Sequence, residues 1–139
     1  LYLSAYFEAH RQDYYDLLQR VRTLGDRAAW IRFFLAGVTE TAREGVQRAG
    51  QLMDLRESFR QRVRDKPKAL ALTDALFLNP YMSVTRAEKL LKVSNPTARQ
   101  AVRVLEGKGI LEEISGRAWG RLYLARPILE AIEGSPGTT

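Results

Sequence analysis

Two groups of polar side chains in the second half of the chain have the types and spacing that nucleic-acid binding needs. Arginine pairs bidentately with guanine, and asparagine or glutamine pairs with adenine, whereas basic side chains outside the groove hold phosphates. The candidates for base-edge contacts are Asn95, Thr97, Arg99, Gln100 and Arg103. The candidates for phosphate contacts are Lys108, Arg117, Trp119 and Arg121.

A predicted helix carries the base-edge candidates on one of its faces. Residues 94–97 (SNPT) give its start, because Ser or Asn caps a helix and proline is tolerated in the first turn. Gly107 and Gly109 are expected to end it. The opposite face is apolar at helical spacing and consists of Ala98, Ala101, Val102 and Leu105.

A shorter helix and a hairpin are expected on either side of this helix. Thr85 and Glu88 have the spacing of a capping box, so we expect them to open a helix that ends before a tight turn at residues 92–94. Two β-type runs, residues 110–114 and 121–125, follow and are joined by six residues between them. Helix, tight turn, helix and hairpin form the order of a winged helix-turn-helix, whose second helix enters a major groove.

The remaining chain predicts a mainly α-helical protein of two parts. Residues 1–66 indicate a bundle of about three helices, and residues 67–133 the winged helix-turn-helix domain with a small hairpin wing. The boundary is set at Pro67, because proline disfavours helix in the residue before it. Residues 68–78 and 127–133 are expected to be the first and last helices of the second domain, and residues 134–139 a flexible tail.

The helices of the first part differ in how they distribute apolar residues. Residues 10–24 are amphipathic, and Gly25 with Asp26 is expected to break this helix, with Asp26 as the cap of the next one. Residues 28–38 are apolar nearly all round, with Arg32 as the one charge. Residues 39–64 predict a long amphipathic helix, in which Gly50 allows a bend or break. A helix that is apolar on most sides needs neighbours, so we expect the chain to form a homodimer.

Charge and composition indicate which kinds of partner and which cellular location to expect. The net charge is +6, and residues 67–126 contain 10 basic and 5 acidic residues, a net charge of +5. This positive charge would favour a polyanion as the partner. An ordinary solvated surface rich in arginine explains the charge equally well. The chain has no cysteine, no apolar run long enough for a membrane span and no recognisable signal peptide, so a cytoplasmic location is expected.

No group of residues predicts catalysis within this chain. His10 is the one histidine and has no second ligand near it in the sequence, so we expect a surface or capping role and no metal or cofactor. The winged helix then has two open functions, DNA binding or protein contact. Glu106, Glu112 and Glu113 favour protein contact, because carboxylates repel a phosphate backbone.

Four segments of the first part of the chain are distinctive in sequence: residues 1–8 (LYLSAYFE), 10–15 (HRQDYY), 25–26 (GD) and 30–35 (WIRFFL). With these segments the first part of the chain resembles the last helices of the bacterial Fic (filamentation-induced-by-cAMP) family. The resemblance covers essentially the whole chain and is specific in residues 1–38. It implies a protein adenylyltransferase, many members of which continue into a C-terminal winged helix.

The family's catalytic motif, His-Pro-Phe-x-x-Gly-Asn-Gly-Arg, has no counterpart here, since His10 is followed by Arg11 and Gln12. No catalytic residue can be carried over, and ATP and Mg²⁺ are implied only for a longer parent. The start at Leu1 suggests a fragment, with the catalytic domain of that parent as a partner. The resemblance thus implies a non-enzymatic region whose winged helix regulates or localises the parent through DNA, or controls adenylylation through protein contacts or dimerisation.

Overall fold

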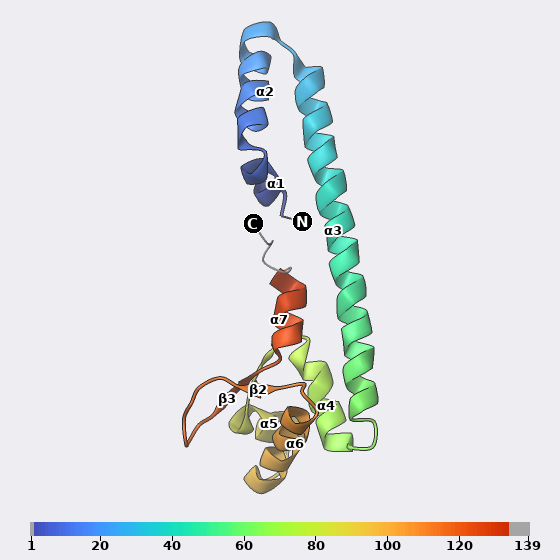
Figure 1. Cartoon of the computed structure of the whole chain (residues 1–139), viewed down its shortest axis with the longest axis vertical. Helices are drawn as coiled ribbons and strands as arrows, with labels where there is room; N and C mark the ends of the chain where they lie inside the picture. The colour runs from blue at the N-terminus through green and yellow to red at the C-terminus, as the bar shows by residue number, and fades with distance from the viewer. Residues whose placement is uncertain (1, 134–139) are drawn as a thin grey trace. The chain divides into compact units, whose positions relative to one another are not determined.

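In a computed structural model the chain is mainly helical, and the structure describes residues 2–133 (Figure 1). The expected tail, residues 134–139, and Leu1 lie outside this range. No helix in the described range is both long and apolar enough to cross a membrane. Its seven helices and three strands are α1 (Leu3–Ala9), α2 (Arg11–Leu24), α3 (Arg27–Arg62), α4 (Pro67–Leu76), β1 (Tyr81–Ser83), α5 (Val84–Leu91), α6 (Asn95–Gly107), β2 (Glu112–Glu113), β3 (Leu122–Leu124) and α7 (Arg126–Glu133).

The chain divides into two compact units, Leu1–Ala49 and Gly50–Thr139. The division lies within α3, whereas the sequence favoured a boundary at Pro67. The physical reason is the core of the second unit, which includes Phe59 and Val63, both 0% exposed, from the end of α3 and the turn after it. Pro67 begins α4, as its residue type predicts.

In the first unit, α1, α2 and the beginning of α3 pack through aromatic rings. Gly25 ends α2 with a φ of +69°, and Asp26 caps α3 by accepting a hydrogen bond from the Ala29 amide at 3.3 Å, as the sequence predicted. The ring of Phe7 lies 6.1 Å from that of Trp30 and 5.1 Å from that of Tyr14, measured between centroids. These contacts join all three helices of the unit.

The apolar segment at residues 28–38 is less covered than its composition predicts. Ile31 is 52% exposed and Leu35 is 54% exposed. The helix also runs without interruption from Arg27 to Arg62, so the possible break near Gly50 does not occur. Within the first unit, the side of α3 that carries Ile31 and Leu35 is therefore left more than half exposed.

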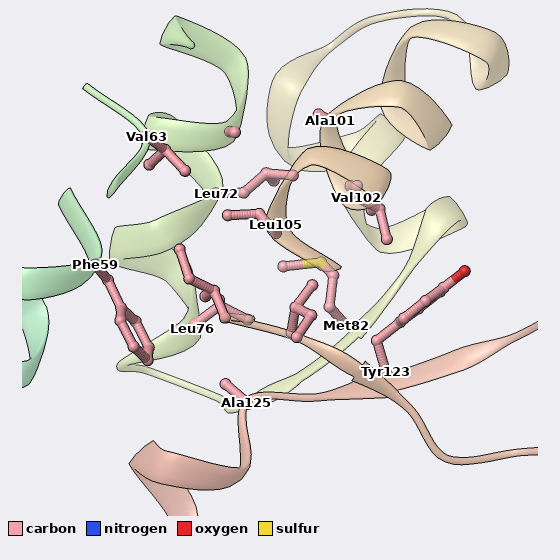
Figure 2. Close-up of a cluster of buried hydrophobic side chains, with 14 of the residues drawn as sticks. Phe59, Val63, Leu72, Leu76, Met82, Ala101, Val102, Leu105, Tyr123 and Ala125 are labelled. Carbon is pink, nitrogen blue, oxygen red and sulfur yellow. The ribbon is translucent and has the colours of Figure 1, made fainter. Parts of the chain in front are cut away.

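The second unit has a conventional core, drawn in Figure 2. Leu72 and Leu76 of α4 meet Val102 and Leu105 of α6, and all four are fully buried. Met82 of β1 completes this layer beside the sheet. α5 and α6 pack on α4, α6 through its apolar face and α5 through the buried Ala87, whereas Leu90 of α5 is 47% exposed.

The sheet has three antiparallel strands in the order β1-β3-β2, one more than the predicted hairpin. Tyr81 of β1 is opposite Leu124 of β3, and Glu112 of β2 is also opposite Leu124. The wing strands are shorter than the predicted runs at residues 110–114 and 121–125. Ile110 and Leu111 are buried in the core before β2 begins, so their apolar character reflects packing and not strand pairing.

Candidate nucleic-acid interface

The first helix of the helix-turn-helix begins with a different cap from the predicted one. Ser83 precedes α5, and its hydroxyl accepts a hydrogen bond from the Arg86 amide at 3.1 Å. Thr85 is the second residue of the helix, so the expected capping box with Glu88 is wrong. The Arg86 side chain donates to the carbonyl oxygens of Tyr81 and Asn79 and thereby ties α5 to the strand before it.

The turn between α5 and α6 is tight, as predicted. Lys92 closes α5 in the left-handed region, with a φ of 53°. The Asn95 side-chain amide then donates to the Glu88 carboxylate at 3.0 Å, which joins the first residue of α6 to the helix before the turn. The Thr97 hydroxyl lies 3.1 Å from the Ser94 hydroxyl. Two of the five base-edge candidates, Asn95 and Thr97, therefore already have intramolecular hydrogen bonds at this turn.

α6 presents the remaining three candidates to solvent. Its apolar face is buried as predicted, and Arg99, Gln100 and Arg103 are exposed. Arg99 donates to the Asn95 side-chain oxygen at 3.2 Å, so its guanidinium is partly oriented by a neighbour one turn away.

Arg99 and Arg103 line a hollow of about 210 Å³ together with Trp119 and Arg121 of the wing. The two arginines come from α6, whereas the other two side chains lie between β2 and β3. Trp119 is 83% exposed, which is unusual for so large an apolar surface in a folded domain. The structure therefore brings candidates of both groups, base-edge and phosphate, to one place.

Gln100 and Thr97 lie on a second, more open hollow of about 550 Å³. Lys66 and Lys68, on either side of Pro67, line the same hollow. These two lysines were not among the candidates that the sequence suggested. The signal that could have found them is their positive charge, which the fold places beside the second helix of the helix-turn-helix.

Lys108 and Arg117 are exposed but line neither hollow. Lys108 follows α6 directly and is close enough to Asp65 to contribute to lowering the pKa of that carboxyl group. The main cause of that lower pKa is a backbone hydrogen bond of Asp65 itself. Arg117 lies in the wing, where its carbonyl oxygen accepts a hydrogen bond from Arg121 at 3.1 Å.

Two of the three carboxylates that favoured a protein partner are engaged within the chain. Glu112 forms an ion pair with Arg126, and the hydrogen bond between them raises the pKa of the guanidinium. Glu113 accepts hydrogen bonds from the Ser115 hydroxyl and from the amides of Ser115 and Gly116, which lower its pKa, the hydroxyl contributing most. The ion pair with Arg126 offsets the charge of Glu112, whereas the lowered pKa keeps Glu113 ionised, so Glu106 and Glu113 retain their predicted effect.

The amino-terminal end of α5 also borders the hollow beside the wing. Ser83 and Thr85 both line it, which adds hydroxyl groups next to the arginines. The sequence analysis assigned Thr85 to capping and so missed this position. A base-edge or phosphate ligand in the hollow would meet cationic and hydroxyl donors together.

Two further expectations from the sequence concern metal binding and His10. In residues 2–133 no three His, Cys, Asp or Glu side chains are grouped so that they could hold a metal ion. His10 lies between α1 and α2, not within a helix, and its Nδ1 is 3.0 Å from the Tyr6 carbonyl oxygen. No protein-family model matches the chain.

Proposed function

We propose that the winged helix-turn-helix unit binds double-stranded DNA, with α6 in the major groove and the wing against the phosphate backbone. The observation that carries this proposal is the hollow that Arg99, Arg103, Arg121 and Trp119 share. No Asp or Glu is among the described residues that line it. Cations from two separate elements thus converge at a point where a duplex backbone would pass beside a groove.

Charge and local order support the same function. Residues 67–126 have a net charge of +5, a value that already includes the ionised Glu112 and Glu113. The hydrogen bond from Arg99 to Asn95 reduces the rotational freedom that the arginine would lose on binding. Binding should therefore be dominated by phosphate contacts and should weaken as salt rises.

The test is fluorescence anisotropy with a labelled mixed-sequence duplex at 50 and 200 mM salt. We expect the full chain to bind, with an affinity that falls at least tenfold between the two salt concentrations. Arg99→Ala combined with Arg103→Ala should weaken binding by at least a further tenfold at the lower salt. Arg11→Ala combined with Arg22→Ala, both at exposed positions of α2, removes the same charge and should have little effect.

Absence of binding at 50 mM salt would overturn the proposal, as would equal effects of the two double variants. A second readout separates the roles of the arginines. Arg121→Ala should reduce the salt slope by about one and weaken all duplexes alike, as for a phosphate contact. Arg103→Ala should relax the preference among sequences selected from a randomised duplex pool.

A second candidate function is control of adenylylation through protein contact, which rests on the resemblance to the Fic family. The observation that favours it is the apolar part of the open hollow beside Gln100, where Pro67, Pro96 and Val104 line the surface. In a parent adenylyltransferase that contains this chain, Val104→Gln should then change adenylylation, whereas Arg99→Ala with Arg103→Ala should not. The reverse result would assign regulation to the proposed DNA surface.

A further inference from the structure

α3 carries an apolar stripe on its exposed side within the first unit. The stripe is defined by Ile31, Leu35, Val38, Ala42, Val46 and Ala49, which follow one another at steps of four, three, four, four and three residues. Val46 is 75% exposed, and Ile31 and Leu35 are each more than half exposed. Val38, Ala42 and Val46 line a shallow hollow of about 590 Å³.

The spacing of this stripe suits a second helix. Four, three and four residues make an eleven-residue repeat of about 3.67 residues per turn, close to the 3.6 of a straight α-helix. The stripe therefore runs nearly parallel to the axis of α3 and stays narrow. An eleven-residue repeat is typical of helices that pair in a right-handed supercoil, so a second helix can follow such a stripe over several turns.

Glycine and alanine in the middle of the stripe allow close approach. Gly45 is three residues after Ala42 and four before Ala49, so all three share one face of the helix. A Cβ added at Gly45 would meet no atom within 4 Å, so nothing in the described chain requires a glycine there. A glycine in a helix interior costs about 1 kcal/mol relative to alanine. Close approach of a partner's backbone would explain why a glycine stands at this position despite that cost.

The charges beside the stripe select the partner. Arg32 follows Ile31 and Arg43 follows Ala42, so the same repeat places both exposed arginines on one flank. The carboxylates of this part of α3 are Glu40 and Glu44, each two residues from Ala42 and therefore on the far side of the helix. Glu44 is moreover paired with Arg48 at 3.5 Å. The stripe is thus apolar in the middle and cationic at its edge.

A second copy of the chain fits this surface poorly. Its own stripe would bring Arg32 and Arg43 and no flanking carboxylate, whichever way the two helices ran. A flat lipid surface would leave Gly45 without an explanation, because lipid does not require close backbone approach. Complementary charge and a small central residue are together the requirements of a helix-in-groove or helix-pair contact.

We propose that this stripe docks an amphipathic helix of another protein, with apolar residues on the same eleven-residue repeat and Asp or Glu along one flank. The docking surface belongs to the first unit and is independent of the proposed DNA-binding hollow. Its apolar stripe supplies affinity, and Arg32 with Arg43 sets the orientation and the preference for acidic partners.

The test uses two synthetic helical peptides of roughly 20 residues, long enough for stable helix formation. Both have leucine at the repeat positions, with glutamate on one flank in the first peptide and lysine in the second. Titrated into the full chain by isothermal calorimetry, the glutamate peptide should bind at least tenfold more tightly than the lysine peptide. This preference should shrink as salt is raised.

Two variants locate the binding surface. Arg32→Glu combined with Arg43→Glu should weaken the glutamate peptide about tenfold and strengthen the lysine peptide. Leu35→Gln combined with Val46→Gln should weaken both peptides, and both side chains are exposed enough to leave folding intact. Arg22→Glu combined with Arg64→Glu is the matched control, because it changes the same charge at exposed positions away from the stripe. Circular dichroism of each variant checks that its helices form.

Three results would overturn the proposal. The first is equal binding of the two peptides, or binding of neither. The second is a dimer in analytical ultracentrifugation that Leu35→Gln with Val46→Gln dissociates, because the occupant would then be a second copy. The third is capture of the protein by vesicles of anionic phospholipid that depends on the same residues, which would assign the stripe to a lipid surface.

Discussion

The two compact units use apolar residues in opposite ways. The second unit buries large side chains completely, among them Leu72, Leu76 and Leu105. In residues 2–49 of the first unit, Gly37 and Thr41 are the buried residues, and none of the aromatic residues is fully buried. The difference teaches that the second unit contains its own closed apolar core, whereas the first unit is joined by contacts between partly exposed rings and leaves apolar side chains in water.

The largest expected effect comes from shortening one leucine side chain to alanine in each unit and comparing the two losses of stability. Leu105→Ala should lower the free energy of unfolding by about 2–5 kcal/mol, because it leaves a cavity in a closed core. Leu35→Ala should cost below about 1 kcal/mol, because the side chain is already mostly in water. Urea unfolding monitored by circular dichroism measures both. Equal costs would remove the distinction between the units.

Two glycines of α3 give a second test within one helix. A Cβ at Gly37 would lie 2.5 Å from the Tyr6 ring, whereas one at Gly50 would meet no atom within 4 Å. Gly37→Ala should therefore destabilise the first unit by about 1–3 kcal/mol, because the ring contact between α1 and α3 must shift. Gly50→Ala should stabilise the protein by up to about 1 kcal/mol through helix propensity.

Near-ultraviolet circular dichroism follows the aromatic rings during thermal unfolding and so reports on the Gly37 change directly. Loss of the aromatic signal at lower temperature is the expected result for Gly37→Ala. An unchanged signal would mean that Tyr6 moves aside at no cost. The first unit would then be looser than its ring distances indicate.

The corrected cap of α5 provides a smaller test in the second unit. Ser83→Ala should destabilise that unit by about 1 kcal/mol, because it removes the hydroxyl that accepts from the Arg86 amide. Thr85→Ala should change stability by a few tenths of a kcal/mol at most, because Thr85 is not the cap. Urea titrations of the two variants at pH 7 give the comparison, and a larger cost at Thr85 would restore the predicted capping box.

The sequence predicted those features that depend on local periodicity and short-range capping. The buried face of α6, the tight turn at Lys92 and the cap at Asp26 are confirmed. β1 was missed because Tyr81–Ser83 is too short to show alternation and pairs with β3, which is distant in sequence. The cap of α5 was misplaced because Thr85 has Glu88 three residues after it, as a capping box requires, whereas Ser83 has Arg86 there. β1 extends to Ser83, so the helix begins directly after it and Ser83 is the cap.

The candidate site was predicted in composition but not in arrangement. Helical periodicity could place Arg99, Gln100 and Arg103 on one exposed face, and they lie there. Periodicity could not show that Arg99 and Arg103 share a hollow with the wing. Nor could it show that Gln100 borders Lys66 and Lys68, because both arrangements depend on packing between distant segments. DNA binding and the relation to the Fic family remain predictions from the sequence.

The smallest expected effect concerns the link between the end of α3 and α4 in the second unit. Asp74 accepts hydrogen bonds from Arg56 at 2.9 Å and from Arg60 at 2.6 Å. Burial alone would raise the pKa of Asp74, but these two guanidinium groups outweigh it together, and the pKa falls below its ordinary value. A lowered folded-state pKa stabilises the fold at neutral pH, and this contribution is lost as pH falls through the folded-state pKa.

Asp74→Asn should therefore destabilise the second unit most at pH 7, and the difference from the unmodified chain should shrink below about pH 4. The effect should stay below about 1 kcal/mol, because the carboxylate is 41% exposed and screened by water. Asp54→Asn is the control, since it removes the same charge from an exposed position of α3. Urea unfolding at pH 7, 5 and 3 measures the difference, and a gap that does not change with pH would show that Asp74 acts by packing and not by charge. The ion pairs would then add little to a unit whose stability comes from its buried leucines, and the contrast between the two units would rest on apolar burial alone.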